Sequence, residues 1–110
     1  MLKNLLLVEI NECDFDYFLY GSKKYNYPNI KKFFLNKREI DTFTNDKYEG
    51  FNLDPWVQWV SVHTGKLSKY HKIYRLGEKL NKSIDQIWDK LSKKNFKSSI
   101  WGAFNSTLTP

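Results

Sequence analysis

The chain has 110 residues, of which 41% are hydrophobic and 17% aromatic, and this composition excludes a disordered polypeptide. The formal charge of +6 comes almost entirely from lysines that are spread along the chain with acids between them. Specific base recognition relies on arginine and on a contiguous basic face, so nucleic acid is a disfavoured partner. No apolar run approaches the roughly 18 residues of a membrane helix. The single cysteine, Cys13, excludes an internal disulfide and fits a reducing cytoplasm.

The first predicted element is a strand. Residues 4–10, NLLLVEI, form a nearly continuous apolar run, which is typical of a strand covered on both faces of a parallel sheet. Polarity changes abruptly after it, at Asn11, Asp14 and Asp16. Asn11 suits a turn or a metal position, and the two aspartates suit caps for the next helix.

Two short helices and a long loop are predicted next. Apolar residues at helical spacing indicate a helix from Phe15 to Gly21 and a second one within YPNIKKFFLNK, residues 27–37, with Pro28 near its first turn. Residues 36–53 are polar and have no sustained period. A loop of that length inside a compact domain is usually functional or mobile.

The stretch NLDPWVQWVSVHTGK, residues 52–66, predicts a helix over 55–64. Asp54 suits the N-cap, Pro55 the first helical position and Gly65 the C-terminal stop. Its tryptophans and valines cover most of the circumference, so we expect a central helix that is buried nearly all round. Ser61 and His63 cannot form a catalytic pair, because residues two apart on a helix point away from each other.

The last predicted elements are a helix over 83–94, capped by Ser83, and a strand in KSSIWGAF, residues 97–104. The order strand, helices, strand predicts a parallel pair with a right-handed crossover. The predicted fold class is α/β: a partial parallel sheet with covering helices, in one domain over 1–110 that is incomplete at its C-terminus.

The motifs carry a resemblance when they are read in order. LLLVEINECDFDYF is followed by YPNIKKFF, then by PWVQWVSVHTG with KLSKYHKI, and finally by DQIWDKLSKKNFKSSIWGAFN. This series resembles the N-terminal portion of the alkaline-phosphatase superfamily, in its type I phosphodiesterase and nucleotide pyrophosphatase branch. The resemblance implies metal-dependent hydrolysis of phosphate or related esters through a phospho-enzyme on two divalent cations, Zn or Mn/Mg.

The resemblance can be followed position by position, and at the family's catalytic positions this chain has different residues. The metal-binding aspartate of the family falls on Asn11, which offers a carbonyl oxygen but no charge. Its nucleophile falls on Pro55, which cannot attack. The amide that stabilises the phosphoryl oxygens falls on Gln58, and the histidine after the nucleophile helix falls on His71.

Three further positions match the family: Asp16, Thr64 and Gly65. Asp54 is a second candidate metal ligand, although its place at the N-cap already accounts for an acid there. The later metal ligands of the family lie beyond the end of this chain.

The resemblance therefore implies an N-terminal fragment or degenerate member of a metal-dependent hydrolase family that is inactive by itself. Two alternatives stay open: a non-catalytic module for a phosphorylated or sulfated ligand, and a lysine-rich nucleic-acid binder. A lone parallel strand pair leaves two edges and one sheet face uncovered, so we expect a missing C-terminal portion or self-association.

Overall fold

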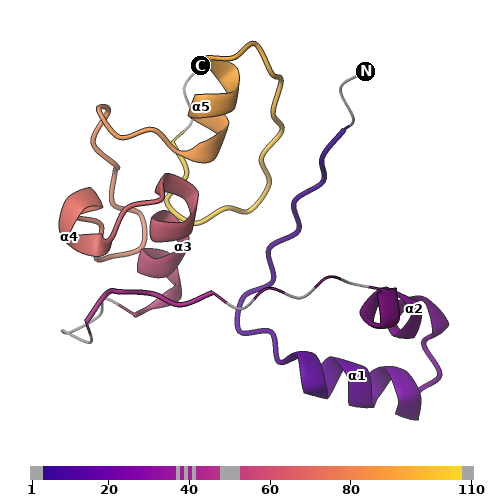
Figure 1. The fold of residues 1–110 in the computed structure, drawn as a ribbon. Coiled ribbons are helices and arrows are strands. Elements are labelled where there is room, and N and C mark those ends of the chain that lie inside the picture. Colours follow the sequence, from indigo (N-terminus) through magenta and orange to yellow (C-terminus); the bar gives the residue numbers. More distant parts are fainter. Residues whose placement is uncertain (1–3, 37, 39, 41, 48–52, 108–110) are drawn as a thin grey trace. The chain divides into compact units, whose positions relative to one another are not determined.

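The computed structural model describes residues 4–36, 38, 40, 42–47 and 53–107 (Figure 1). The described residues form five helices, and the chain divides into two compact units, Met1–Thr42 and Phe43–Pro110. None of the described residues belongs to a strand, so the predicted α/β fold with a partial parallel sheet is wrong.

The first unit contains two helices, α1 (Phe15–Lys24) and α2 (Pro28–Asn36). Asp14 caps α1 as expected: its side chain accepts a hydrogen bond of 2.9 Å from the backbone N–H of Tyr17. The helix runs three residues past the predicted end at Gly21, since a glycine near the end of a helix costs only a little stability and need not stop it.

Aromatic contacts hold α1 and α2 together. The ring of Phe34 on α2 meets two rings of α1, with centroids 5.7 Å from Phe15 and 6.4 Å from Phe18. None of the described apolar side chains of this unit is fully buried. Its stability therefore depends on a few ring contacts and helix caps rather than on a closed core.

Residues 4–10, the first predicted strand, are extended but are not part of a β-strand (Figure 1). The second predicted strand, 97–104, is also irregular and belongs to the other unit. An apolar pattern shows that a segment favours burial, but a strand also needs a partner for its backbone N–H and C=O groups. The apolar pattern therefore indicates burial but does not identify a segment with which the strand could pair.

The second unit contains α3 (Pro55–Thr64), α4 (Ser68–His71) and α5 (Ile87–Ser92). The bounds of α3 are those predicted, and α4 was not predicted. α5 is shorter than the expected 83–94, because the chain turns at 82–84 and the helix begins only after Gln86. The N-cap of α5 is therefore Gln86 and not Ser83.

A small core lies beside α3. It consists of the buried side chains of Val57, Val60, Ile73 and Leu80. Val62, on the same helix, is 66% exposed, whereas the other positions of α3 are buried or half-buried, so the expectation of a helix buried nearly all round holds except at Val62.

Two amide side chains hold the C-terminal segment of this unit. Gln86 is fully buried, and its oxygen accepts hydrogen bonds from the backbone N–H and the hydroxyl of Thr107 at 2.8 and 2.9 Å. Gln86 Nε2 donates to the carbonyl of Asn105 at 3.2 Å. Asn105 in turn accepts from the N–H of Gly77 at 2.7 Å and donates to the carbonyls of Trp56 and Arg75. These bonds join segments that are far apart in the sequence.

Candidate functional site

The carboxylate of Asp46 is the centre of a polar cluster in the second unit. The backbone N–H of Ser68 lies 3.1 Å from Oδ1 and 3.2 Å from Oδ2, and Ser68 Oγ lies 2.9 Å from Oδ1. Gln58 Nε2 donates to Oδ2 at 3.2 Å, and Ser61 Oγ lies 3.4 Å from the same oxygen. Donors from three places in the chain thus converge on one carboxylate.

Helical spacing explains how these donors come together. Gln58 and Ser61 are three residues apart on α3, and Ser68 and His71 are three apart on α4, so each pair shares one face of its helix. Between the helices the chain reverses through Gly65, whose φ of 69° lies in the left-handed region that glycine adopts without strain. We call Gln58, Ser61, Ser68 and His71 the donor cluster.

His71 joins the donor cluster through Ser61, whose Oγ lies 3.0 Å from His71 Nε2. The other ring nitrogen, Nδ1, lies 3.0 Å from the backbone nitrogen of Ile73 and can only accept there, because the Ile73 N–H is the donor. Neutral His71 therefore carries its proton on Nε2 and donates to Ser61 Oγ. The donors then run in one direction: Ile73 N–H to His71 and His71 to Ser61, whose own proton has two acceptors at 3.4 Å, Asp46 Oδ2 and the carbonyl of Val57.

This direction bears on catalysis. A histidine that activates a serine must present an unprotonated nitrogen to the hydroxyl, with the other nitrogen bonded to an acceptor. Here the unprotonated nitrogen of His71 faces the N–H of Ile73, and Asp46 lies on the side of Ser61 rather than behind the ring. The three residues have the composition of a Ser-His-Asp triad but not its arrangement.

The environment fixes the charge states of Asp46 and His71. Burial acts to raise the pKa of the Asp46 carboxyl, but the hydrogen bonds from Ser68 and Gln58 and the nearby His71 outweigh it and hold that pKa below its usual value. Burial lowers the pKa of His71, and the negative charge of Asp46 opposes this only in part. At neutral pH the pair is a carboxylate beside a neutral imidazole.

These shifts predict that acid destabilises the second unit in two steps. His71 has a lowered pKa when folded, so the unfolded chain binds the extra proton first, and stability falls as the pH drops below about 6.5. Asp46 also has a lowered pKa when folded, so its contribution is present above about pH 4 and is lost below it. We expect the urea midpoint to fall between about pH 7 and 5 because of His71.

The control for this prediction is His71→Gln, which leaves His63 as the one histidine of the chain. The variant should lose most of the change in midpoint between about pH 7 and 5, whatever its stability at neutral pH. An unchanged slope would mean that His71 is not the group that titrates.

The structure brings together two of the predicted site residues, Gln58 and His71. It also places His71 beside Ser61. The helix geometry that excludes a Ser61–His63 pair does not predict this contact. Thr64 Oγ1 donates to the carbonyl of Val60 at 2.7 Å and serves the helix.

Two other predicted residues lie at the start of α3. Pro55 occupies the first helical position. The backbone carbonyl of Asp54 accepts from the N–H groups of Val57 and Gln58, while its side chain makes no cap hydrogen bond. The expected capping role of the Asp54 carboxylate is therefore not seen.

Asn11 and Asp16 belong to the first unit, whereas Asp54 belongs to the second. The described residues contain no group of three His, Cys, Asp or Glu side chains that could hold a metal ion. The two-cation centre stays an expectation from the resemblance, and we derive no reaction step through a metal.

Sequence reasoning missed Asp46 and Ser68. Asp46 is one of four acids in the polar stretch 36–53, and Ser68 lies 22 positions further on. Neither stands in a pattern that identifies it. The preference of serine for the first turn of a helix was the one available indication for Ser68.

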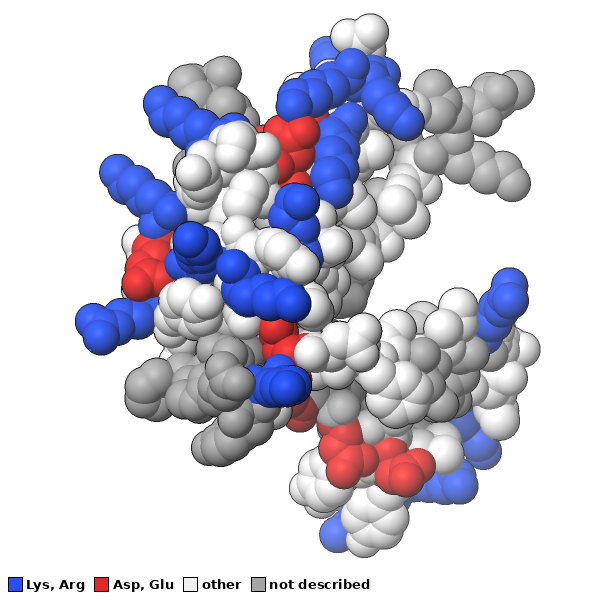
Figure 2. Space-filling view, turned by 60° about the vertical axis from the view of Figure 1, so that its left-hand side comes forward, with Lys and Arg blue, Asp and Glu red and all other residues white. Residues whose placement is uncertain are grey.

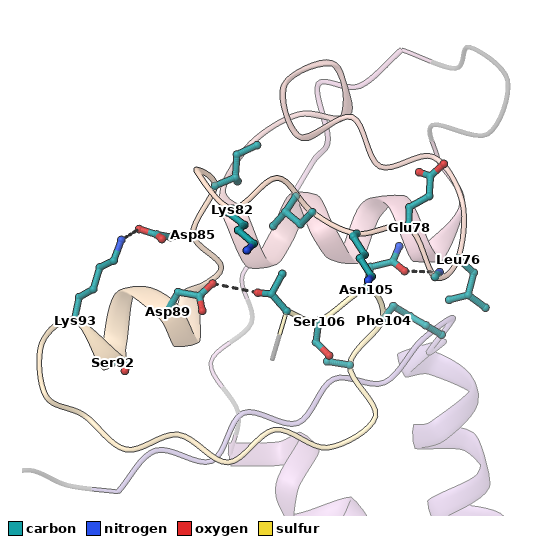
Figure 3. Close-up of a pocket in the computed structure, with 16 residues that line it drawn as sticks. Leu76, Glu78, Lys82, Asp85, Asp89, Ser92, Lys93, Phe104, Asn105 and Ser106 are labelled. Carbon is teal, nitrogen blue, oxygen red and sulfur yellow. Dashed lines mark hydrogen bonds and ion pairs between the residues drawn. The ribbon is translucent and has the colours of Figure 1, made fainter. Parts of the chain in front are cut away.

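A hollow of about 980 Å³ lies elsewhere in the second unit, between residues 76–93 and the segment 103–107 (Figure 3). The polar groups that Figure 3 joins by dashed lines are engaged within the chain: Lys93 pairs with Asp85 at 2.5 Å, and Asp89 Oδ2 lies 3.3 Å from the Thr107 hydroxyl, which is closer to Gln86 at 2.9 Å. Asn105 accepts from Gly77. These contacts join the segments around the hollow, and the groups that form them do not converge on a ligand site.

Comparisons of the chain with models of protein families, with curated proteins and with solved structures return no match. The resemblance to the alkaline-phosphatase superfamily therefore stays a prediction. Within the described residues, no helix combines the length and apolar character needed to cross a bilayer.

Proposed function

We propose that the second unit is a non-catalytic anion-binding module whose donor cluster takes the phosphate or sulfate group of a ligand in place of the Asp46 carboxylate. The observation that carries this proposal is the convergence of Gln58, Ser61 and Ser68 on one carboxylate. An ionised carboxylate only accepts hydrogen bonds, as the oxygens of phosphate and sulfate esters do. Asp46 is the chain's own stand-in for the ligand anion.

The charge around the donor cluster supports an anionic ligand. Residues 43–110 contain eleven Lys and Arg against six Asp and Glu, a formal charge of +5. Lys66, Lys69 and Lys72 flank or belong to α4. Figure 2 shows Lys and Arg side chains that project from the surface, with acids between them. Such an excess raises the local concentration of an anion and speeds its encounter with the site.

The direction of the hydrogen bonds favours binding over turnover. His71 donates to Ser61, so Ser61 offers its proton onward to an acceptor rather than giving it to a base. From the resemblance to phosphoric-ester hydrolases the proposal takes only the class of ligand, and it assigns no reaction to this chain. Cys13, the one cysteine of the chain, fits a reducing compartment, and a cytoplasmic location is part of the proposal.

The test is to empty the donor cluster and measure anion binding directly. Asp46→Ala removes the internal anion, and isothermal titration with inorganic phosphate and with sulfate, at constant ionic strength, follows the result. We expect the variant to bind at least one of the two anions about tenfold more tightly than the unmodified chain, which corresponds to one charged hydrogen bond made available.

Two further variants make the test specific. Asp46→Ala combined with Ser68→Ala loses a hydroxyl of the donor cluster and should bind the anion more weakly than Asp46→Ala alone. Asp46→Asn serves if the alanine variant fails to fold, because it keeps the size of the side chain and removes the charge. Equal affinity of all variants and the unmodified chain would mean that the anion binds elsewhere and would overturn the proposal.

A further inference from the structure

Four tyrosine side chains of the first unit form one row, which we call the tyrosine row: Tyr17, Tyr20, Tyr25 and Tyr27. The ring centroids of Tyr17 and Tyr20 are 6.5 Å apart, and those of Tyr25 and Tyr27 are 6.2 Å apart. The ammonium group of Lys24 joins the two pairs, since its Nζ lies 5.6 Å from the ring centroid of Tyr20 and 5.4 Å from that of Tyr25. A cation therefore lies at the middle of a row of aromatic rings.

The local backbone explains how the row forms. Tyr17, Tyr20 and Lys24 follow one another at spacings of three and four residues, so they share one face of α1. The chain then turns, and the N–H of Tyr27 donates to the carbonyl of Ser22 at 2.9 Å. This hydrogen bond ties the second pair of rings to the end of the helix that carries the first pair.

The packing of the unit does not bury the tyrosine row. Phe15, Phe18 and Phe34 provide ring contacts between α1 and α2. The four tyrosines, in contrast, are between 53% and 72% exposed. A contiguous exposed surface of large rings indicates a site of interaction with another molecule.

The charge around the tyrosine row favours an anionic partner. Residues 17–36 contain four lysines and no acid. Lysines contact the phosphate groups of nucleic acids, and aromatic side chains stack on bases that are not paired. Residues 17–36 also contain no arginine, the residue that most often reads base edges, so this surface is suited to stacking without base-specific recognition.

The composition of the row favours nucleic acid over a lipid surface. A peripheral membrane helix inserts Trp, Phe or Leu side chains among the lipids, next to its lysines. Each ring of the tyrosine row carries a hydroxyl group, which is costly to bury among acyl chains. Flat rings with a polar edge match nucleobases, which are also flat and polar at their edges.

We propose that the tyrosine row is a binding surface for single-stranded nucleic acid. Its rings stack on unpaired bases, and the lysines of residues 17–36 contact the phosphates between them. Bases inside a duplex are paired and stacked on one another, so they are not available to the rings. The proposal is independent of the anion-binding function, which concerns the second unit.

The first experiment measures binding of a short, fluorescently labelled oligodeoxythymidylate to the full chain by anisotropy. We expect saturable binding that weakens about 50-fold between about 50 and 200 mM salt, since four phosphate contacts with a single strand give a logarithmic slope of about −3. The same oligonucleotide paired with its complement should bind more weakly. Absence of binding at low salt, or a duplex that binds as tightly as the single strand, would overturn the proposal.

The second experiment separates stacking from apolar contact. Tyr20→Leu removes the ring and keeps an apolar side chain, and it should weaken binding of the single strand at least about fivefold. Tyr20→Phe keeps the ring and should stay within about twofold of the unmodified chain. The matched control is Tyr70→Leu, which should leave the affinity unchanged, because Tyr70 is 60% exposed on α4 and has Lys69 Nζ 5.0 Å from its ring centroid but lies outside the row.

Equal losses in Tyr20→Leu and Tyr70→Leu, or in Tyr20→Leu and Tyr20→Phe, would overturn the proposal. Circular dichroism checks that the helices are intact, and Tyr17→Leu replaces Tyr20→Leu if the latter loses helix.

Sedimentation with phosphatidylserine vesicles tests the lipid surface as the alternative partner. We expect Tyr20→Leu to leave vesicle binding unchanged. A loss of vesicle binding in this variant, with binding of the oligonucleotide unaffected, would assign the row to a membrane and overturn the proposal.

Discussion

Replacing Gln86 with leucine is expected to lower the free energy of unfolding of the second unit by about 3 kcal/mol, because it removes three hydrogen bonds to half-buried groups, each worth about 1 kcal/mol. Gln86 is fully buried and forms hydrogen bonds with the hydroxyl and backbone N–H of Thr107 and with the carbonyl of Asn105. Leucine has about the volume of glutamine, but its side chain can form no hydrogen bond with these groups. The segment 105–107 would lose its attachment to α5.

Urea unfolding followed by tryptophan fluorescence measures this effect. Lys82→Leu is the matched control, since it also introduces leucine, but at an exposed position of the segment that leads to α5. Its free energy of unfolding should stay within about 0.5 kcal/mol of that of the unmodified chain. A Gln86→Leu midpoint equal to the control would show that the amide contacts do not hold the C-terminal segment.

Val60→Ala is expected to cost about 2 kcal/mol, from two buried methyl groups and the cavity that they leave. Val60 is fully buried and packs with Ile73 and Leu80 in the small core of the second unit. Because this core has few members, each of them carries a large share of the stability.

Val62→Ala is the control for Val60→Ala, since it makes the same change two positions along α3 at a residue that is 66% exposed. It should change the free energy of unfolding by no more than about 0.5 kcal/mol. Equal losses in the two variants would contradict the orientation of α3.

The helices could be predicted where their signals are local. The bounds of α3 follow from Pro55 at its first position and from Gly65, which adopts the left-handed conformation at its end. Asp14 fixed the start of α1 in the same way. The apolar run 4–10 predicts a sheet strand, but pairing depends on a partner that lies far away in the sequence, and no local pattern contains that information.

Some residues of the candidate site could be predicted from the sequence and others could not. The order of motifs singles out Gln58 and His71, and the structure places both side chains in the donor cluster, an arrangement that the resemblance does not specify. Asp46 was not found, since its importance comes from contacts with residues 12 to 22 positions away. A polar side chain becomes part of a site through contacts with residues far away in the sequence. The local sequence around an aspartate in a polar loop does not indicate such contacts.

The most direct measurement of the central claim is a titration of the Asp46→Ala chain with inorganic phosphate, followed by the backbone amide resonance of Ser68 in a ¹⁵N–¹H correlation spectrum. The Ser68 N–H contacts both oxygens of Asp46, so an anion that takes their place must shift this resonance. The account predicts a saturable shift of Ser68, together with the side-chain amide of Gln58, in the variant and a much weaker one in the unmodified chain. Saturable shifts confined to lysines elsewhere, with Ser68 and Gln58 unmoved, would contradict it.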